Sequence, residues 1–99
     1  MRMIGELVDF IDEEIEGAKT YAEKYLQLKA EGVNDYGNKF KAMANQELEH
    51  ANIVHEYAVS QINKLNQVYT APVEMQEAWD KSHKEYVEKT AWIKQMLTM

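Results

Sequence analysis

The sequence predicts an all-α fold of three helices, in which the first two form a long antiparallel hairpin. Apolar residues recur every three or four positions along most of the 99 residues, which is the spacing of one face of a helix. One proline and four glycines leave few places where a helix would have to stop. The length fits a single domain that spans residues 1–99.

The first helix is expected at about residues 3–31. With 100° per residue, Glu14 lies on the flank of its apolar face, roughly 60° from the centre. Gly17 weakens the helix by about 1 kcal/mol relative to alanine, but it allows another helix to come close. Gly32 suits the position that follows the last turn of a helix. The apolar positions of this segment are Ile4, Leu7, Val8, Ile11, Ile15, Ala18, Ala22, Tyr25 and Leu26.

The second helix is expected at about residues 35–68, with Asn34 as its N-cap. Glu47 lies within about 20° of the centre of its apolar face, where a core residue is expected. His50 follows one turn later, on the flank of the same face. A carboxylate in the middle of an apolar face is a conflict between pattern and charge, and such conflicts concentrate at functional sites. The face is formed by Phe40, Met43, Ala44, Glu47, Ala51, Val54, Ala58, Gln61, Ile62 and Leu65.

The third helix is expected at about residues 73–97. Pro72 fits the first turn of a helix, where a missing N–H group costs nothing, and Glu74 interacts favourably with the helix dipole. The positions on the apolar face of this helix are Met75, Ala78, Trp79, Ser82, Tyr86, Thr90, Ile93, Met96 and Leu97.

Composition and charge exclude several classes of function. The net charge of −6 provides no basic patch that could neutralise the phosphates of a nucleic acid. The absence of cysteine excludes disulfides, thiolate zinc sites and iron–sulfur clusters. No run approaches the roughly 18 apolar residues of a membrane span, so no membrane partner is expected. The first ten residues lack the apolar core of a signal peptide, and a cytoplasmic location is therefore expected.

Glu47 and His50 form the strongest candidate site. Burying an unpaired carboxylate costs several kcal/mol, so Glu47 needs a basic side chain, a proton or a metal ion beside it. No lysine or arginine lies on the inward faces of the first two helices. A glutamate and a histidine one turn apart, both facing inward, form the metal-binding pair found in helical bundles. The alternative is a satisfied polar pair in the core, or a helix face that is in fact exposed.

Glu14 is the third candidate ligand. It belongs to the acidic run at residues 12–16, and a run of this kind usually forms a solvated surface. Glu14 is the acid of this run that lies near the apolar face. An antiparallel pairing of the first two helices would bring it opposite Glu47, with a mismatch in register of roughly 7 Å.

The spacing of these residues resembles one half of the ferritin-like di-iron carboxylate proteins. The matching positions are Glu14 and Tyr21, seven residues apart, followed by Glu47-x-x-His50, and the resemblance covers about residues 7 to 58. Rubrerythrins and bacterioferritins carry this half-pattern twice in one chain. Short ferritin-like proteins, including encapsulated ferritins and small proteins of phages and prophages, carry it once.

The resemblance implies that Glu14 and His50 are terminal metal ligands, that Glu47 is a bridging ligand and that Tyr21 is hydrogen-bonded near the metals. A complete site of this class has four carboxylates and two histidines, so a homodimer or a higher even oligomer is needed to complete a four-helix bundle. Oxygen and imidazole ligands suit iron, with manganese as the alternative. The implied function is iron binding with ferroxidase or peroxide-reducing oxidoreductase activity, in which dioxygen or peroxide reacts, and no catalytic residue is expected beyond the ligands.

Other candidates carry less chemistry. His83 lies about 60° from the centre of its face, and it is either an additional metal ligand or a half-exposed histidine. His55 lies more than 100° around the second helix from His50, so the two cannot bind one ion together. The zincin motif and a thiol nucleophile are absent. The alternative function is a metal-free helical interaction or structural module, phage-derived, in which Glu47, His50 and Tyr21 form a residual buried network.

Overall fold

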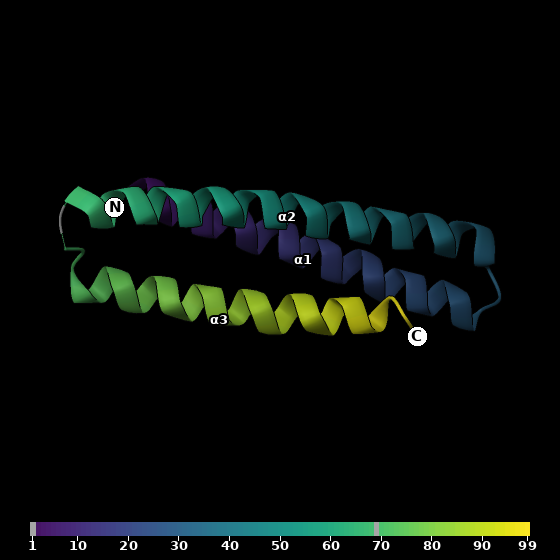
Figure 1. Ribbon diagram of the computed structural model, residues 1–99. Coiled ribbons are helices and arrows are strands. Elements are labelled where there is room, and N and C mark those ends of the chain that lie inside the picture. The colour runs from purple at the N-terminus through teal and green to yellow at the C-terminus, as the bar shows by residue number, and fades with distance from the viewer. Residues whose placement is uncertain (1, 69) are drawn as a thin grey trace.

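The protein consists of three helices and their connections, as seen in a computed structural model that describes residues 2–68 and 70–99 (Figure 1). Helix α1 spans Arg2–Ala30, α2 spans Asn34–Val68 and α3 spans Val73–Met96. No strand occurs among the described residues. The expected helix ranges differ from these bounds by one residue at four of the six helix ends and agree with them at the other two. The molecule is elongated, with principal extents of 55 × 18 × 17 Å.

Glycine closes α1 in the way the sequence predicts. Gly32 has a φ of 77°, a left-handed conformation that costs glycine little. The N–H of Val33 donates to the carbonyl of Leu28, and the N–H of Gly32 donates to that of Lys29. These two bonds define a Schellman motif, which satisfies the last carbonyls of the helix and reverses the chain.

Two details of the caps differ from the sequence-based expectation. The N–H of Gly37 donates to the carbonyl of Val33, which makes Val33 the N-cap of α2 and places Asn34 inside the helix. Pro72 is the N-cap of α3, since its carbonyl accepts bonds from the N–H groups of Met75 and Gln76. Part of the expected break before α3, Tyr69, lies outside the described residues.

The core lies along the seam between α1 and α2. Alanines with no exposed surface occupy it from both sides, so the two backbones come close together. Ile11 and Ile15 of α1 and Leu48 of α2 fill the space around them, and the end of α3 adds Ile93 and Met96. The alanines of the seam are Ala18 and Ala22 of α1 and Ala44 and Ala51 of α2.

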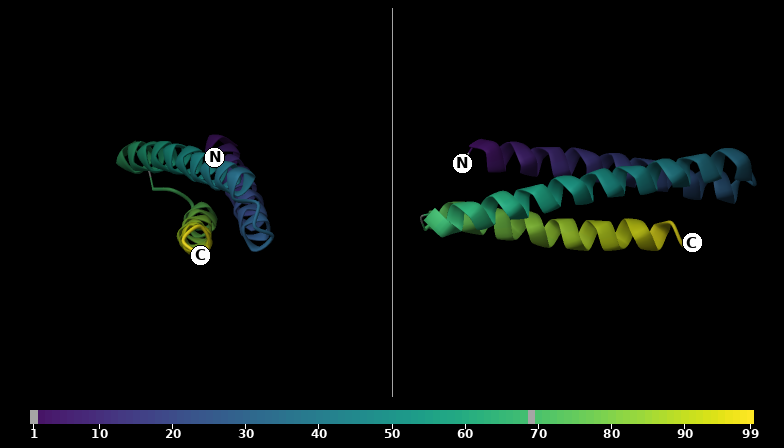
Figure 2. Two further views of the ribbon diagram at one scale, coloured as in Figure 1. Left: turned by 90° about the vertical axis from the view of Figure 1, so that its right-hand side faces the viewer. Right: turned by 45° about the horizontal axis from the view of Figure 1, so that its top comes forward.

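Helix α3 packs mainly against α1 and approaches the backbone of α2 less closely. The end-on view in Figure 2 shows that it lies on one side of the α1–α2 hairpin. The opposite side of the hairpin is therefore left without a third helix, and we call this side the open face. None of the helices in the described part of the chain has a stretch long and apolar enough to cross a bilayer.

Candidate metal centre

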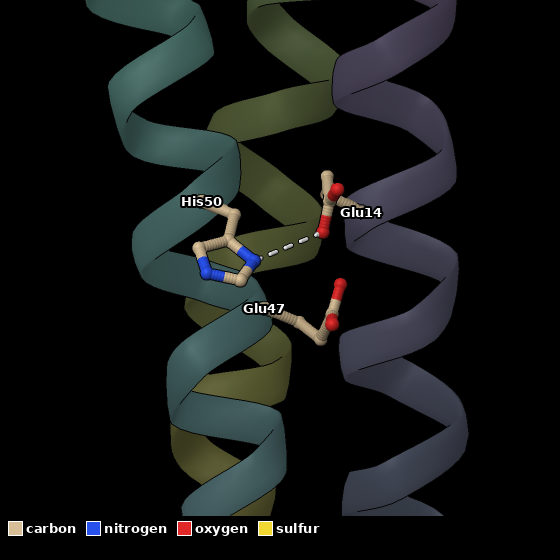
Figure 3. Close-up of side chains that lie close together, drawn as sticks. All are labelled: Glu14, Glu47 and His50. Atoms are coloured by element: carbon tan, nitrogen blue, oxygen red, sulfur yellow. Dashed lines mark ion pairs between the residues drawn. The ribbon is translucent and has the colours of Figure 1, made fainter.

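Glu14 of α1 and Glu47 and His50 of α2 come together on the open face. Each residue offers one ligand atom, and these three atoms all lie within 4.8 Å of one another. Figure 3 shows the side chains between α1 and α2, with α3 behind the hairpin. The antiparallel register thus places Glu14 of α1 opposite Glu47 and His50 of α2, the three residues that the helical spacing indicated.

Glu14 is largely enclosed, with one carboxylate oxygen fully covered. It is 19% exposed, and its Oε2 atom is fully covered without accepting a hydrogen bond. The nearest basic group is Nδ1 of His50, 3.5 Å from Oε2, in a ring that is 55% exposed. A distance of 3.5 Å is too long for a strong hydrogen bond, so the covered oxygen retains an unused lone pair directed into the cluster.

Glu47 lies against α1 at the point where that helix has a glycine. An ideal Cβ placed on Gly17 would lie 3.3 Å from Oε2 of Glu47 and 3.6 Å from its carboxyl carbon. The absence of a side chain at position 17 therefore provides the space that the carboxylate of Glu47 occupies. The sequence indicated that Gly17 permits close approach, but not that the approaching group is the carboxylate of a candidate ligand.

The carboxylate of Glu14 perturbs the titration of Glu47. The pKa of Glu47 is raised, first by a side-chain hydrogen bond with Glu14, which one of the two groups can donate only when it is protonated. Partial burial and the negative charge of Glu14 raise the pKa further, and His50 opposes the shift. Among the described side chains, His50 is the one potentially positive group in an ion pair with this cluster. The site therefore has more negative charge than its protein neighbours neutralise.

The rim of the open face is apolar. Phe10 precedes Glu14 by about one turn on α1, and Met43 and Tyr57 lie seven residues on either side of His50 on α2. These large side chains are 48%, 36% and 49% exposed, respectively. Large apolar groups exposed around a polar centre are typical of a surface that another molecule covers.

The remaining candidates lie elsewhere. Tyr21 is partly buried on α1, where its ring is tilted against Phe40 at a centroid distance of 6.1 Å, and its expected bond near the metals stays a prediction. His83 does not join Glu14 and His50, because it lies on α3 and its Nδ1 atom is 2.9 Å from Nε2 of His55. The sequence did not indicate this pair of histidines, since it depends on how α3 is rotated about its axis.

Comparisons with protein-family models, with curated proteins and with solved structures find no significant match for this chain.

Proposed function

We propose that this protein binds non-haem iron in a ferritin-like di-iron site, half of which is the cluster of Glu14, Glu47 and His50. The observation that carries the proposal is the unbalanced charge of this cluster. Two carboxylates share a partly covered space, and one of them has a buried oxygen without a hydrogen bond. A divalent cation would neutralise both carboxylates and would use the free lone pair of Glu14.

The spacing of the donor atoms fits a first-row divalent ion. Such an ion bonds carboxylate oxygen and imidazole nitrogen at about 2.0–2.2 Å, so its ligand atoms lie roughly 3 to 4.4 Å apart. The separation of 3.5 Å between Glu14 and His50 falls within this range, and the 4.8 Å limit for the whole set requires only small side-chain rotations. Oxygen and nitrogen donors favour iron or manganese over metals that prefer sulfur.

A second copy of the chain would complete the site. One protomer supplies two carboxylates and one histidine, whereas a di-iron site in a helical bundle uses four carboxylates and two histidines. A two-fold axis through the open face would supply each ligand twice and would bury the apolar rim of Phe10, Met43 and Tyr57. In this arrangement two hairpins form the four-helix bundle, and each α3 packs on its outside.

Each ligand has a distinct part in this proposal. By the resemblance to ferritin-like proteins, Glu47 would bridge the metal ions, while Glu14 and His50 would each bind one of them terminally. A bound pair of irons supplies the electrons that reduce dioxygen or peroxide, so ferroxidase or peroxide-reducing activity is the expected chemistry. Because the pKa of Glu47 is raised, protons compete with the metal for this carboxylate, and metal binding should weaken as the pH falls.

The test is an anaerobic titration with Fe(II), followed by exposure to air. The absorbance that accompanies iron oxidation is recorded for the parent protein, for Glu47→Ala and for the matched control Glu49→Ala, whose side chain is exposed on the same helix. Light scattering gives the mass of each species. We expect saturation at two irons per dimer and rapid oxidation in the parent and the control, and neither in Glu47→Ala.

Three results would argue against the proposal. A parent protein that remains monomeric at every concentration could not form a complete site. Equal binding by Glu47→Ala would place the metal elsewhere. No uptake of Fe(II) or Mn(II), together with a Glu47→Ala variant at least as stable as the parent, would favour the metal-free helical module with a residual polar network.

A further inference from the structure

A second cluster joins α2 to α3 on the side of α2 that faces away from the candidate metal centre. The ring of His55 is stacked on Tyr86 at a centroid distance of 4.2 Å and an interplanar angle of 5°. It also stacks on Trp79 at 5.5 Å, and on His83 at 5.1 Å. The backbones of α2 and α3 approach one another less closely than the other packed pairs. The stacked rings therefore bridge the two helices through their side chains.

The centre of this cluster is a hydrogen bond between two histidines. Nε2 of His55 and Nδ1 of His83 are 2.9 Å apart. A neutral imidazole has one N–H donor and one acceptor nitrogen, so the bond requires one proton between the two facing nitrogens. The hydroxyl of Tyr86 donates a further bond to Oδ1 of Asn52, at 3.2 Å, which again joins α3 to α2.

Protonation affects this bond in two steps. A first added proton leaves an imidazolium that donates to a neutral imidazole, and the bond persists in a charge-assisted form. After a second proton is added, both facing nitrogens carry a hydrogen, so neither can accept a hydrogen bond from the other. Each ring is then positively charged, and the two rings repel one another. The doubly protonated pair therefore cannot keep the 2.9 Å geometry.

We propose that the His55–His83 pair is an acid-labile clasp, whose double protonation releases the first half of α3 from α2. The second half of α3 stays in place, because Ile93 and Met96 are buried in the core with the α1–α2 seam. The C-terminal half of α3 is thus held by hydrophobic packing at any pH, whereas the contact of its N-terminal half with α2 depends on protonation.

The surrounding groups favour the neutral pair. Burial lowers the pKa of His55, the neighbouring His83 lowers it further, and the carboxylate of Glu56 opposes the shift. Other titratable groups lie at the contact between α1 and α3. There Asp12 interacts with Lys89 and Glu85, and not with the two histidines. Glu56 on α2 is the charged group that acts on both His55 and Tyr86. The titratable groups on the neighbouring parts of α1 and α3 are Asp9, Asp12, Glu74, Glu85 and Lys89.

The clasp is tested on the full-length protein in the presence of a chelator, so that metal binding does not contribute. Imidazole ¹⁵N NMR between about pH 8 and about pH 5 reports the protonation of each ring nitrogen. Variants His55→Gln and His83→Gln assign the signals of the two rings. Hydrogen exchange read by mass spectrometry, corrected for the pH dependence of the intrinsic rate, compares residues 73–86 with residues 87–96.

We expect the pair to titrate in two separate steps, with the second below the midpoint of an ordinary histidine. Exchange protection of residues 73–86 should fall at least about tenfold with the second step, while that of residues 87–96 changes little. The variant His83→Phe keeps a ring but cannot accept the bond or a proton, and it should show no such pH dependence.

Two results would overturn the proposal. Independent titration of His55 and His83, each in a single step at the ordinary histidine midpoint of about 6.5, would show that they do not share a proton. Equal loss of protection in both halves of α3, or unchanged protection after both histidines have become charged, would show that the bond does not hold the helix. The NMR result is obtained on the parent protein, so it remains informative if a variant does not fold.

Discussion

Replacing Gly17 with alanine should make the metal-free protein more stable and its metal binding weaker. Within a helix, alanine is favoured over glycine by about 1 kcal/mol. The new Cβ would meet Oε2 of Glu47 at 3.3 Å, so the carboxylate must move by a few tenths of an ångström. Because the displaced atoms are at the end of a flexible side chain, we expect this shift to cost only about 0.5 kcal/mol or less.

The net gain of roughly 0.5–1 kcal/mol corresponds to a rise in Tm of about 2–8 °C for a chain of this size. Metal affinity should change in the opposite direction, by about tenfold, if a displaced bridging carboxylate loses about 1.4 kcal/mol of binding energy. Thermal unfolding by circular dichroism in the presence of a chelator measures the first effect, and anaerobic Fe(II) titration measures the second. Both are carried out at one protein concentration, because the stability of a dimer depends on concentration.

Gly5→Ala is the matched control, since Gly5 lies in the same helix and an added Cβ there would meet nothing within 4 Å. It should show the gain in stability without the loss of affinity. A Gly17→Ala variant that binds iron as tightly as the parent would refute the reasoning that this glycine positions Glu47. A large loss of stability in Gly17→Ala would also refute the reasoning, because it would mean that the carboxylate of Glu47 cannot move away from the new Cβ.

Three further predictions address charge, assembly and pH. Glu47→Gln should raise the Tm of the metal-free protein near neutral pH by removing the repulsion from Glu14, and calorimetry with a chelator would contradict this if the Tm fell. Phe10→Glu should convert dimers to monomers and abolish iron binding, whereas Trp92→Glu, equally exposed but on α3, should do neither in sedimentation and titration experiments. Folding lowers the pKa of His55, so the unfolded chain binds a proton at this residue more readily than the folded protein does. The contribution of neutral His55 to stability is therefore present above the unfolded pKa of about 6.5, and it is lost as the pH falls below that value. Urea unfolding at a series of pH values should therefore show that acidification lowers the free energy of unfolding less in His55→Phe than in the parent. An equal decrease in both proteins would show that His55 is not the group responsible.

The first two helices and the cluster between them could be predicted because each rests on local periodicity. Glu47 interrupts an apolar face, His50 follows one turn later, and a short turn at Gly32 forces the antiparallel pairing that brings Glu14 opposite them. Axial register within a hairpin depends mainly on the length of its turn. For this reason the spacing of residues along two helices was sufficient to place three side chains together.

The contacts of α3 could not be predicted in the same way. Its inward face includes Ser82 and Thr90, so the periodicity defines its rotation poorly, and its position depends on packing against α1 rather than on a short turn. The pairing of His83 with His55 follows from that rotation. The position of Glu47 against Gly17 was missed for another reason: spacing gives the direction of a side chain but not the space that it enters.

The alanine seam determines more than the packing of the core. Ala18 follows Glu14 by one turn, and Ala51 is the next residue after His50, so both lie beside the proposed ligands without touching a metal. The side chains at a helix contact set the distance between the axes. A change to valine at either alanine would move the carboxylates of α1 and α2 apart while leaving every ligand intact. Preference for a smaller or larger ion could therefore evolve, or be engineered, through residues that no search for ligands would select.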